Sequence, residues 1–382
     1  MNFDLTEEQN MIREAVRDFA EREIKPVAIE NDKNEHFSVE LAEKMGELGL
    51  FGVTVSPDYG GHGMDTLSYI IAVEELARVD GSTAATIAAH NSLGIGPLND
   101  FGTEEQKKKY LPQLCTGKGL WSFGLTEPSA GSDTQGTKTT AVRTNDKWII
   151  NGSKTFITNA STPISKGVNA LAVTGERPDG KKEFTAFIVE KGAQGYTQHT
   201  LHDKLMWRAS DTAELFFDNV SVGDENIIGK VGQGAHIMLQ TLDSGRLSIA
   251  AMGLGCAQGA YELALAHAQE RKQFGKPLCK FQAISFKLAD MATKIELARN
   301  LLYKACWLKE QHRPFSKEAA MSKLYCAEIA GEVANDAVQI FGGYGLLKDY
   351  NVERFYRDQR LLQIGEGTSE VQRIVISRQI GC

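Results

Sequence analysis

A lone carboxylate lies between two glycines near the end of this 382-residue sequence, in the segment 363–370 (QIGEGTSE). Glycine removes side-chain bulk on both sides of Glu366, and the Thr-Ser-Glu that follows suits the start of a helix. The pattern therefore predicts a carboxylate that reaches from a loop toward a bound molecule. Taken alone, Gly-Glu-Gly is also compatible with a solvated turn.

Four further segments carry residues that could serve such a site. An arginine can pair with a phosphate group, and paired glycines let a ligand approach the backbone closely. Each segment alone has an ordinary alternative, such as a buried strand for FITN or a surface ion pair for Arg271. The segments are 125–133 (LTEPSAGSD), 156–159 (FITN), 271–276 (RKQFGK) and 339–345 (QIFGGYG).

Helical patterns are expected on both sides of these segments. At the N-terminus, Thr6-Glu7-Glu8-Gln9 has the form of a capping box, and Ile12, Val16 and Phe19 follow on one face. Further helices are predicted at residues 39–48, 67–78 and 104–111.

The pattern changes between about residues 121 and 222 to short apolar runs that are typical of strands. Turns are expected at Asn145-Asp146 and at Pro178-Asp179-Gly180, which are rich in turn-forming residues. The predicted strands include 148–150 (WII), 170–173 (ALAV) and 184–189 (FTAFIV).

A helical period returns after residue 232. Pro314 is expected to break it, with Ser316 as the cap of the next helix. The sequence thus predicts an α+β multidomain protein with an N-terminal all-α domain (1–120), a small barrel-like β domain (121–230) and a C-terminal four-helix bundle (231–382). The bundle seam is expected to comprise Ile284, Leu288, Met291, Ile295, Ala298 and Leu302.

The composition is that of an ordinary globular protein, with 42% hydrophobic and 24% charged residues. A net charge of −7 favours neither nucleic acid nor an anionic membrane as partner. The N-terminal segment 1–5 (MNFDL) lacks a basic region and an apolar core, and the sequence has no uninterrupted apolar run of ~18 residues. We therefore expect a cytoplasmic protein that does not span a membrane.

The six cysteines are scattered without a Cys-x-x-Cys spacing, and the eight histidines suggest no nucleophile or metal pairing. Neither a metal site nor a disulfide framework is predicted, and reduced thiols fit a cytoplasmic location. The cysteines are Cys115, Cys256, Cys279, Cys306, Cys326 and Cys382.

In their order and separation, the five segments resemble those of the acyl-CoA dehydrogenase family, and the resemblance covers nearly the whole chain. It implies FAD as cofactor, an acyl-CoA thioester as substrate and an electron-transferring flavoprotein as electron acceptor. The family commonly forms homotetramers, so a homotetramer is expected.

The reaction of the family explains why a carboxylate is needed. Desaturation removes a weakly acidic proton from the α-carbon while a hydride leaves the β-carbon, so a base and an electron acceptor must flank the substrate. No side chain accepts a hydride, which is the role of the flavin. The resemblance implies that Glu366 is the base, and burial would raise its pKa from the ordinary ~4.3. It also implies that the Glu366 backbone N–H and a flavin hydroxyl hold the thioester oxygen.

The resemblance assigns two groups of cofactor contacts. The first group, expected to line the flavin and the CoA arm or to cover the flavin ring, is Phe123, Leu125, Thr126, Ser132, Phe156, Ile157 and Thr158. Thr368, Ser369 and Glu370 are implied as further cofactor contacts. Those expected at the FAD of a neighbouring subunit are Arg271, Phe274, Gln282, Gln339, Gly342 and Gly343. A cofactor shared in this way requires an oligomer.

Substrate contacts are implied for Ser132, Asp243, Arg246, Gly365 and Gly367. The alternative for Asp243 and Arg246 is an ion pair on one helix face, worth only ~0.2–0.5 kcal/mol. Some relatives carry the base just before this arginine, where this chain has Gly245, so Glu366 alone remains for the role.

Three other polar positions have ordinary explanations. Glu127 is expected to support the turn before Pro128, and Glu370 the start of a helix. His90-Asn91 could lie near the acyl pocket or cap a helix, and we assign it no role.

Gly365 bears on the acyl group. Many straight-chain members of the family carry tyrosine there, whereas relatives acting on branched acyl groups can carry glycine. A branched or alicyclic acyl-CoA is one hypothesis and a short straight chain is the other, while a purely conformational role of the glycine would make the position uninformative.

Two other functions compete with a dehydrogenase. An acyl-CoA oxidase performs the same desaturation but reduces oxygen, and usually carries a second C-terminal domain for which this chain has no room. A non-catalytic helical assembly protein could share the bundle, but would not need Glu366, Arg271 and the glycine pairs together.

Overall fold

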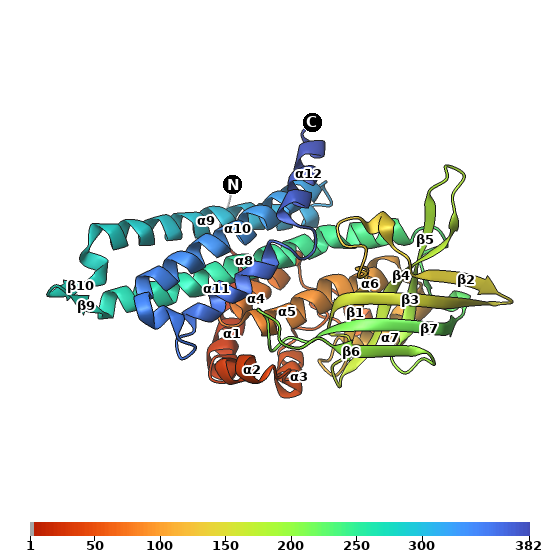
Figure 1. The fold of residues 1–382 in the computed structure, drawn as a ribbon, viewed down its shortest axis with the longest axis horizontal. Coiled ribbons are helices and arrows are strands. Elements are labelled where there is room, and N and C mark those ends of the chain that lie inside the picture. Colours follow the sequence, from red (N-terminus) through yellow and green to blue (C-terminus); the bar gives the residue numbers. More distant parts are fainter. Residues whose placement is uncertain (1–3) are drawn as a thin grey trace.

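Helices, strands and helices again follow one another along residues 4–382, the part of the chain that the computed structural model describes (Figure 1). The predicted α+β class, with a helical, a β and a second helical region, is confirmed. Of the segment 1–5, for which the sequence predicts no targeting region, Met1, Asn2 and Phe3 lie outside the described residues.

The N-terminal helices begin as the sequence predicts. The Thr6 side chain accepts the N–H of Gln9, and the Gln9 side chain accepts the N–H of Thr6, so the capping box is formed. The helices are α1 (Glu7–Phe19), α2 (Ala28–Asn34), α3 (Val39–Glu47), α4 (Thr66–Ala77), α5 (Gly81–Ala88), α6 (Gly96–Phe101) and α7 (Glu104–Leu114).

Two of these helices continue into π-helical turns, Ala20–Ile24 after α1 and Ala89–Gly94 after α5. In the second turn, the N–H of Ile95 reaches the carbonyl of His90 at 2.9 Å, a span of five residues. The turn packs between α8 and β1 and so joins the helical region to the sheet.

The middle region is an eight-stranded mixed sheet with the order β6-β7-β3-β2-β4-β5-β8, to which β1 adds by parallel pairing with β4. The turns predicted at residues 145–146 and 178–180 connect β2 to β3 and β4 to β5. The strands are β1 (Leu120–Gly124), β2 (Thr140–Thr144), β3 (Lys147–Thr158), β4 (Ser165–Glu176), β5 (Lys182–Glu190), β6 (Tyr196–Thr200), β7 (Thr212–Val222) and β8 (Ile227–Ile228).

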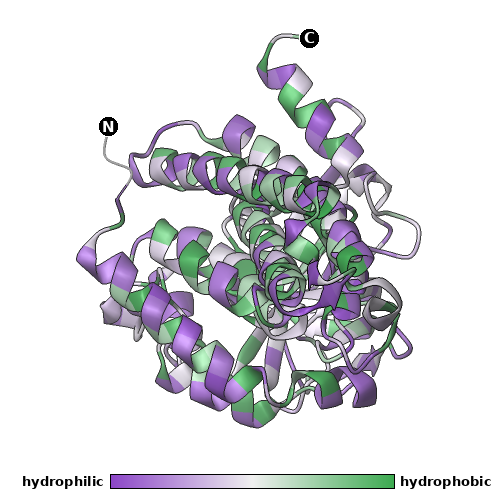
Figure 2. Cartoon of the chain, turned by 90° about the vertical axis from the view of Figure 1, so that its left-hand side faces the viewer, coloured by the Kyte–Doolittle hydropathy of each residue, from purple (hydrophilic) through white to green (hydrophobic). Residues whose placement is uncertain are grey.

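The C-terminal region is built around long helices that lie side by side in Figure 1, seen end-on in Figure 2. Most of the predicted seam on α9 is buried, from Leu288 to Leu302, with Ile284 only partly buried. The elements are α8 (Gly234–Glu270), a hairpin of β9 (Lys272–Gln273) and β10 (Lys276–Pro277), α9 (Gln282–Glu310), α10 (Ser316–Phe341), α11 (Val352–Leu362) and α12 (Ser369–Gln379).

The prediction that Ser316 caps α10 is wrong. Phe315 occupies the cap position and Ser316 is the first helical residue. The Ser316 hydroxyl instead donates to a carboxylate oxygen of Asp243 in α8, at 3.1 Å. The Ser316 hydroxyl therefore bonds to a neighbouring helix instead of capping the backbone of its own helix.

By length and composition, α8 could cross a membrane, but 67% of its most apolar window is buried inside the protein. That burial is typical of the central helix of a bundle. The helix packs on α4, α9, α10, α11 and β5, and so contacts all three regions.

Glycines let neighbouring helices come close to α8. A Cβ atom on Gly255 would lie 2.3 Å from the carbonyl oxygen of Glu74 in α4. A Cβ on Gly253 would lie 2.7 Å from the carbonyl oxygen of Cys326 in α10. Both distances are shorter than carbon–oxygen contacts in packed interiors, so glycine is required for this spacing.

We expect Gly255→Ala to lower the free energy of unfolding by about 1–3 kcal/mol, because the methyl group overpacks against a backbone carbonyl. The loss should occur although alanine is the better helix former by ~1 kcal/mol. Urea unfolding followed by circular dichroism measures it. The control is Ala266→Gly at an exposed position of the same helix, which should lose only the helix propensity. A Gly255→Ala protein that is as stable as the wild type would contradict the close packing.

Candidate active site

Glu366 lies in the loop between α11 and α12 with a left-handed backbone, φ 54°, and Gly367 follows with φ 92°. The residue as a whole is partly exposed, but its carboxyl Oε2 is buried and has no hydrogen-bond partner in the described part of the chain. A non-glycine residue in this conformation costs about 1–3 kcal/mol unless its surroundings hold it there.

The Glu366 carboxyl rests against α8. A Cβ atom on Gly245 would lie 2.1 Å from Oε2 and 2.9 Å from Cδ2 of Leu93, so any larger residue at 245 would displace the carboxyl or Leu93. The alternative location of the base in some relatives, position 245, is therefore adjacent to Glu366 in space. A carboxylate carried by position 245 or by position 366 would therefore lie in the same part of the site.

Burial raises the pKa of Glu366 to about 7, although two nearby cations, Lys323 and Arg246, oppose the shift. At neutral pH the carboxyl is thus poised between its neutral and ionised forms, which suits a group that takes a proton from a weak acid.

Three polar groups hold the loop around Glu366. Lys323 of α10 donates from Nζ to the carbonyl of Gly367 at 2.7 Å, and Gln372 of α12 donates to the same carbonyl at 2.9 Å. Thr368 caps α12 by accepting the N–H of Val371 at 3.2 Å, and Glu370 lies exposed in the first helical turn. The predicted helix start is confirmed. The hydroxyl of Ser369 is buried without a partner in the described part of the chain.

Asp243 and Arg246 form the ion pair on α8 that their spacing allows. Arg246 is nearly buried, at 7% exposed, and its Nε has no partner among the described residues. It also lies close enough to Glu366 to oppose its protonation. The pair is therefore more than a solvated surface contact.

His90 and Asn91 are structural. The His90 ring donates from Nε2 to the carbonyl of Leu114 at 2.9 Å and accepts the N–H of Trp121 at Nδ1, 3.2 Å away. Burial lowers the pKa of His90 to about 4, so the ring is neutral. Asn91 accepts the N–H of Gly52 at 2.8 Å and does not cap a helix.

The first group of predicted cofactor residues gathers where β1 ends beside β3. The N–H of Thr155 donates to the carbonyl of Thr126 at 3.0 Å, which brings 125–126 next to 156–158. Phe156 has φ 59° and its side chain is 70% exposed, whereas Ile157 is buried. Phe123, Thr126 and Thr158 are partly exposed, Leu125 is buried, and Ser132 is exposed on the loop after β1.

An ion pair that the sequence does not reveal holds this loop. Lys154, fully buried in β3, donates from Nζ to Glu127 at 2.8 Å and to the carbonyl of Leu125 at 3.3 Å. Glu127 also accepts the N–H groups of Lys138 and Thr139. Burial alone would raise the pKa of Glu127, but Lys154 and these N–H groups lower it. Glu127 thus does far more than support the turn before Pro128.

The second group lies at the opposite end of the molecule, around the β9–β10 hairpin at the left of Figure 1. The guanidinium carbon of Arg271 lies 5.6 Å from the centre of the Tyr344 ring, which brings it to the turn containing Gly342 and Gly343. Phe274 at the hairpin tip is 92% exposed. Arg271, Gln282, Gln339, Gly342 and Gly343 are also exposed.

One protomer therefore does not bring its two groups of cofactor residues together. The first group lies by the sheet and the second beyond the far end of the bundle (Figure 1). A Cβ on Gly342 or Gly343 would meet no atom within 4 Å in the described structure.

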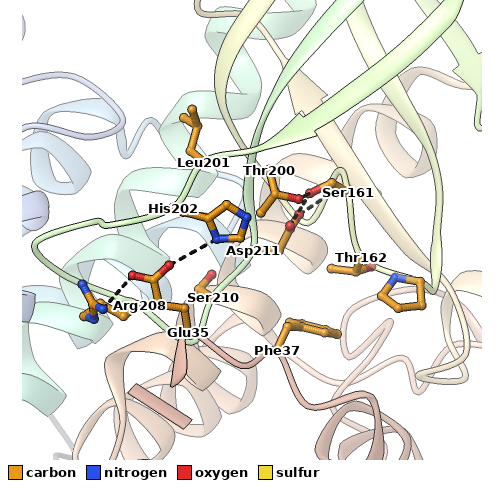
Figure 3. Close-up of a pocket in the computed structure, with 11 residues that line it drawn as sticks. Glu35, Phe37, Ser161, Thr162, Thr200, Leu201, His202, Arg208, Ser210 and Asp211 are labelled. Carbon is orange, nitrogen blue, oxygen red and sulfur yellow. Dashed lines mark hydrogen bonds and ion pairs between the residues drawn. The ribbon is translucent and has the colours of Figure 1, made fainter. Parts of the chain in front are cut away.

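A cavity of about 170 Å³ lies away from Glu366, between Glu35, Ser161, His202 and Asp211. Figure 3 shows Glu35 directed toward both His202 and Arg208. It is hydrogen-bonded to Nδ1 of His202 at 3.2 Å and forms an ion pair with Arg208 at 2.7 Å. A smaller cavity of about 50 Å³ lies against α8 near Gly245. Its lining includes Tyr69, Ser92, Ile95, Ser244 and Leu247.

Sequence reasoning found Glu366 and Arg246 but missed Lys323, Lys154 and Leu93. A lysine within the apolar, small-residue pattern of α10 was the available signal for Lys323. Nothing local marks Leu93, whose place depends on the π-helical turn.

Relatives cover the full length of the chain. The short-chain specific acyl-CoA dehydrogenase of Clostridium acetobutylicum is 49% identical over 380 residues, covering 100% of both chains. The structure of butyryl-CoA dehydrogenase from Megasphaera elsdenii superposes with a TM-score of 0.96 at 43% identity, again over 100% of both chains. A chain from a structure of the electron transferring flavoprotein of Acidaminococcus fermentans has a TM-score of 0.96 and 47% identity over 100% of both chains.

Family models agree with these relatives. The N-terminal, middle and C-terminal domain models of acyl-CoA dehydrogenase match residues 6–118, 122–220 and 232–381 in turn. With the buried glutamate in its loop and the three regions in the expected order, the chain belongs to the acyl-CoA dehydrogenase family.

Proposed function

We propose that this protein desaturates a short acyl-CoA thioester between the α- and β-carbons, with Glu366 as the base and FAD as the cofactor. The carboxyl oxygen of Glu366, which is buried against Gly245 and has no hydrogen-bond partner within the described structure, carries the proposal. Members of the family are FAD-dependent oxidoreductases, so the reaction class follows from membership.

In the proposed step, the bond between the α-carbon and its hydrogen breaks and the proton passes to a carboxyl oxygen of Glu366. The electron pair forms the new carbon–carbon double bond as the hydride leaves the β-carbon. FAD, when bound, accepts that hydride. A base with its pKa raised to about 7 is matched to this task far better than an ordinary carboxylate.

The backbone around Glu366 supports the predicted thioester contact. The Glu366 N–H makes no hydrogen bond within residues 4–382 and is therefore available to the thioester oxygen. Since that oxygen gains negative charge as the proton leaves, a donor fixed at this place would lower the barrier.

The residues present suit FAD. Exposed Phe156 offers an aromatic face beside Thr126 and Thr158, which can donate hydroxyl hydrogen bonds to a ring system. At the far end of the bundle, Arg271 suits a pyrophosphate, and the open surface at Gly342 and Gly343 leaves room for one. We infer that each FAD is held between two protomers.

Exposed apolar side chains support an oligomer, and a homotetramer is our proposal. On α9, Phe286 is 62% and Leu297 57% exposed, and helix α12 stands away from the body in Figure 2 with Ile374 exposed. Single exposed apolar residues are common, but several on the outer helices of one bundle support contact with a partner.

Gly365 bears on the acyl group. Its φ lies outside the left-handed region, and an added Cβ would make only ordinary contacts, the nearest at 3.6 Å to the Leu361 carbonyl. The backbone therefore does not require glycine, which supports a role in shaping the pocket. The relatives named short-chain specific and butyryl-CoA dehydrogenase support a short acyl group, straight or branched.

An electron-transferring flavoprotein is the proposed electron acceptor, since one similar chain comes from a structure of such a protein. A cytoplasmic location stays a prediction from the sequence. The oxidase alternative predicts instead that the reduced enzyme turns over with oxygen as fast as with an electron-transferring flavoprotein.

We expect Glu366→Gln to bind FAD and assemble normally while anaerobic flavin reduction by acyl-CoA slows ~10²–10⁴-fold, because the amide keeps the shape but cannot take a proton. In the wild type, the rate should rise with pH through about 7, as the Glu366 carboxyl ionises. Glu332→Gln, an exposed glutamate on α10, is the control. Near-normal reduction by Glu366→Gln would assign the base to another residue.

Gly343→Val should weaken both flavin binding and assembly, because the added side chain meets open space in its own protomer and can only obstruct a neighbour or its FAD. Gly343 is preferable to Gly342, whose φ of 63° would strain any other residue. Flavin absorbance across a sedimentation boundary measures both effects. Gly175→Val at the end of β4 is the control and should change neither flavin binding nor assembly. A Gly343→Val protein that sediments as a monomer with its full content of flavin would overturn the shared site.

Gly365→Tyr should lower kcat/KM for branched and alicyclic acyl-CoA by an overpacking cost of ~1–3 kcal/mol, while sparing butyryl-CoA. Gly365→Ala, whose Cβ makes ordinary contacts, should leave every substrate unaffected. Anaerobic flavin bleaching with a panel of thioesters provides the measurement. An equal loss for straight, branched and alicyclic substrates would mean that position 365 does not shape the acyl pocket.

A further inference from the structure

Lys323 is a cation in a place where a bundle helix normally carries an apolar residue. It is fully buried in α10, whose neighbouring buried positions are Ala319, Ala320, Cys326 and Ala327. An unpaired ammonium group in such a seam is costly, so a packing role alone would favour a hydrocarbon side chain. The charge itself therefore needs an explanation.

Among residues 4–382, Lys323 makes one hydrogen bond, and it reaches the loop of the base. Its Nζ donates to the carbonyl of Gly367 at 2.7 Å, the residue directly after Glu366. Glu366 and Gly367 are consecutive left-handed residues, with φ 54° and 92°, and this conformation directs the Gly367 carbonyl toward α10. The second donor to the same carbonyl is Gln372, from the opposite helix.

The charged groups around the pair come from four elements. Glu366 is faced by Lys323 of α10 and Arg246 of α8, and the phenol of Tyr69 in α4 is near enough to respond to it. Lys323 is faced by Glu366, Arg246, Glu370 of α12 and Glu328 of α10. Arg246 is already paired with Asp243, whereas no carboxylate in the described part of the chain binds Lys323 directly.

We propose that Lys323 is a positioning residue of the reaction, which fixes the Glu366 loop through the Gly367 carbonyl and stabilises the ionised form of the base through its charge. The proposal rests on the proposed role of Glu366 as the base. Without the lysine, only Arg246 would oppose the effect of burial, and the Glu366 carboxyl would stay neutral to higher pH.

The direction of the effect follows from the sign of the charge. Burial raises the pKa of Glu366 and Lys323 lowers it, so removing the cation moves the ionisation of Glu366 to higher pH. The base must be ionised to accept a proton. The pH range in which the rate of flavin reduction rises with pH should therefore also move to higher pH. Lys323 itself stays charged at neutral pH, because burial lowers its pKa only to about 8.

Two substitutions separate the charge from the hydrogen bond. Lys323→Gln keeps a donor for the Gly367 carbonyl but has no charge, whereas Lys323→Met keeps the stem volume and has neither. Lys317→Met, on the same helix and near Glu318 at the surface, is the matched control. Flavin absorbance and circular dichroism establish first that each variant is folded and loaded.

The measurement is the pH dependence of anaerobic flavin reduction in single turnover. Both Lys323 variants should move the low-pH limb up by about one pH unit, which is about a tenfold loss of rate at a pH on that limb. Lys323→Met should also lower the pH-independent maximum, because the loop loses a donor. Lys317→Met should change neither.

Infrared titration of the buried carboxyl, identified by its loss in Glu366→Gln, gives a second readout without substrate. The carboxyl should ionise at higher pH in both Lys323 variants. An unchanged limb and an unchanged titration in Lys323→Gln would overturn the charge role, and failure of both variants to fold would make Lys323 a stability residue only. Near-normal flavin reduction by Glu366→Gln would refute the role of Glu366 as the base. The infrared titration would even then show whether Lys323 shifts the ionisation of the Glu366 carboxyl.

Discussion

A carboxyl oxygen that is removed from water and has no hydrogen-bond partner among the residues that the structure describes is the costly feature around which this protein is arranged. Such a group keeps its place only if rigid neighbours surround it. The walls are Gly245 of α8, Leu93 of the π-helical turn and a loop whose backbone is held from two helices. All three regions of the chain are needed to hold these walls in position.

Helix α8 connects those walls. It packs on α4 and α5 from the N-terminal region, on β4 and β5 of the sheet and on α9, α10 and α11 of the bundle. Its glycines permit backbone-to-backbone approach, which places the Glu366 loop, carried by α11 and α12, within reach of the same helix. The cofactor residues at the hairpin that follows α8 are exposed, so a neighbouring protomer can reach them.

The parts of this arrangement that local patterns encode could be predicted from the sequence. The capping box at Thr6, the apolar seam of α9 and the loop of Glu366 each depend on residues within a few positions of one another. The prediction for Ser316 was wrong because a helix 73 positions earlier supplied its partner, Asp243.

Two other contacts could not be predicted from the sequence, for the same reason as the contact of Ser316. They are the ion pair of Lys154 with Glu127 and the hydrogen bond from Lys323 to Gly367. Each joins segments that only the folded chain brings together. The available signal was the residue type and not the hydrophobic periodicity, because a lysine on a buried strand or among small buried residues must have a partner. The domain limits and most cofactor contacts remain predictions, because they concern a bound molecule and a neighbouring subunit.

Because of the π-helical turn Ala89–Gly94, the geometry of the site depends on the number of residues in this segment as well as on their types. Its wide turn lets Leu93 approach Gly245 while Gly94 lies against the backbone of Trp121, where a Cβ would come within 2.3 Å of the carbonyl. An α-helix turns by about 100° per residue, so losing one residue here would rotate everything after it by that angle relative to α5. Substitutions in this helix change contacts one at a time, whereas a single deletion would turn Leu93 and Gly94 away from both partners at once. The length of this segment is therefore under stricter constraint than its composition.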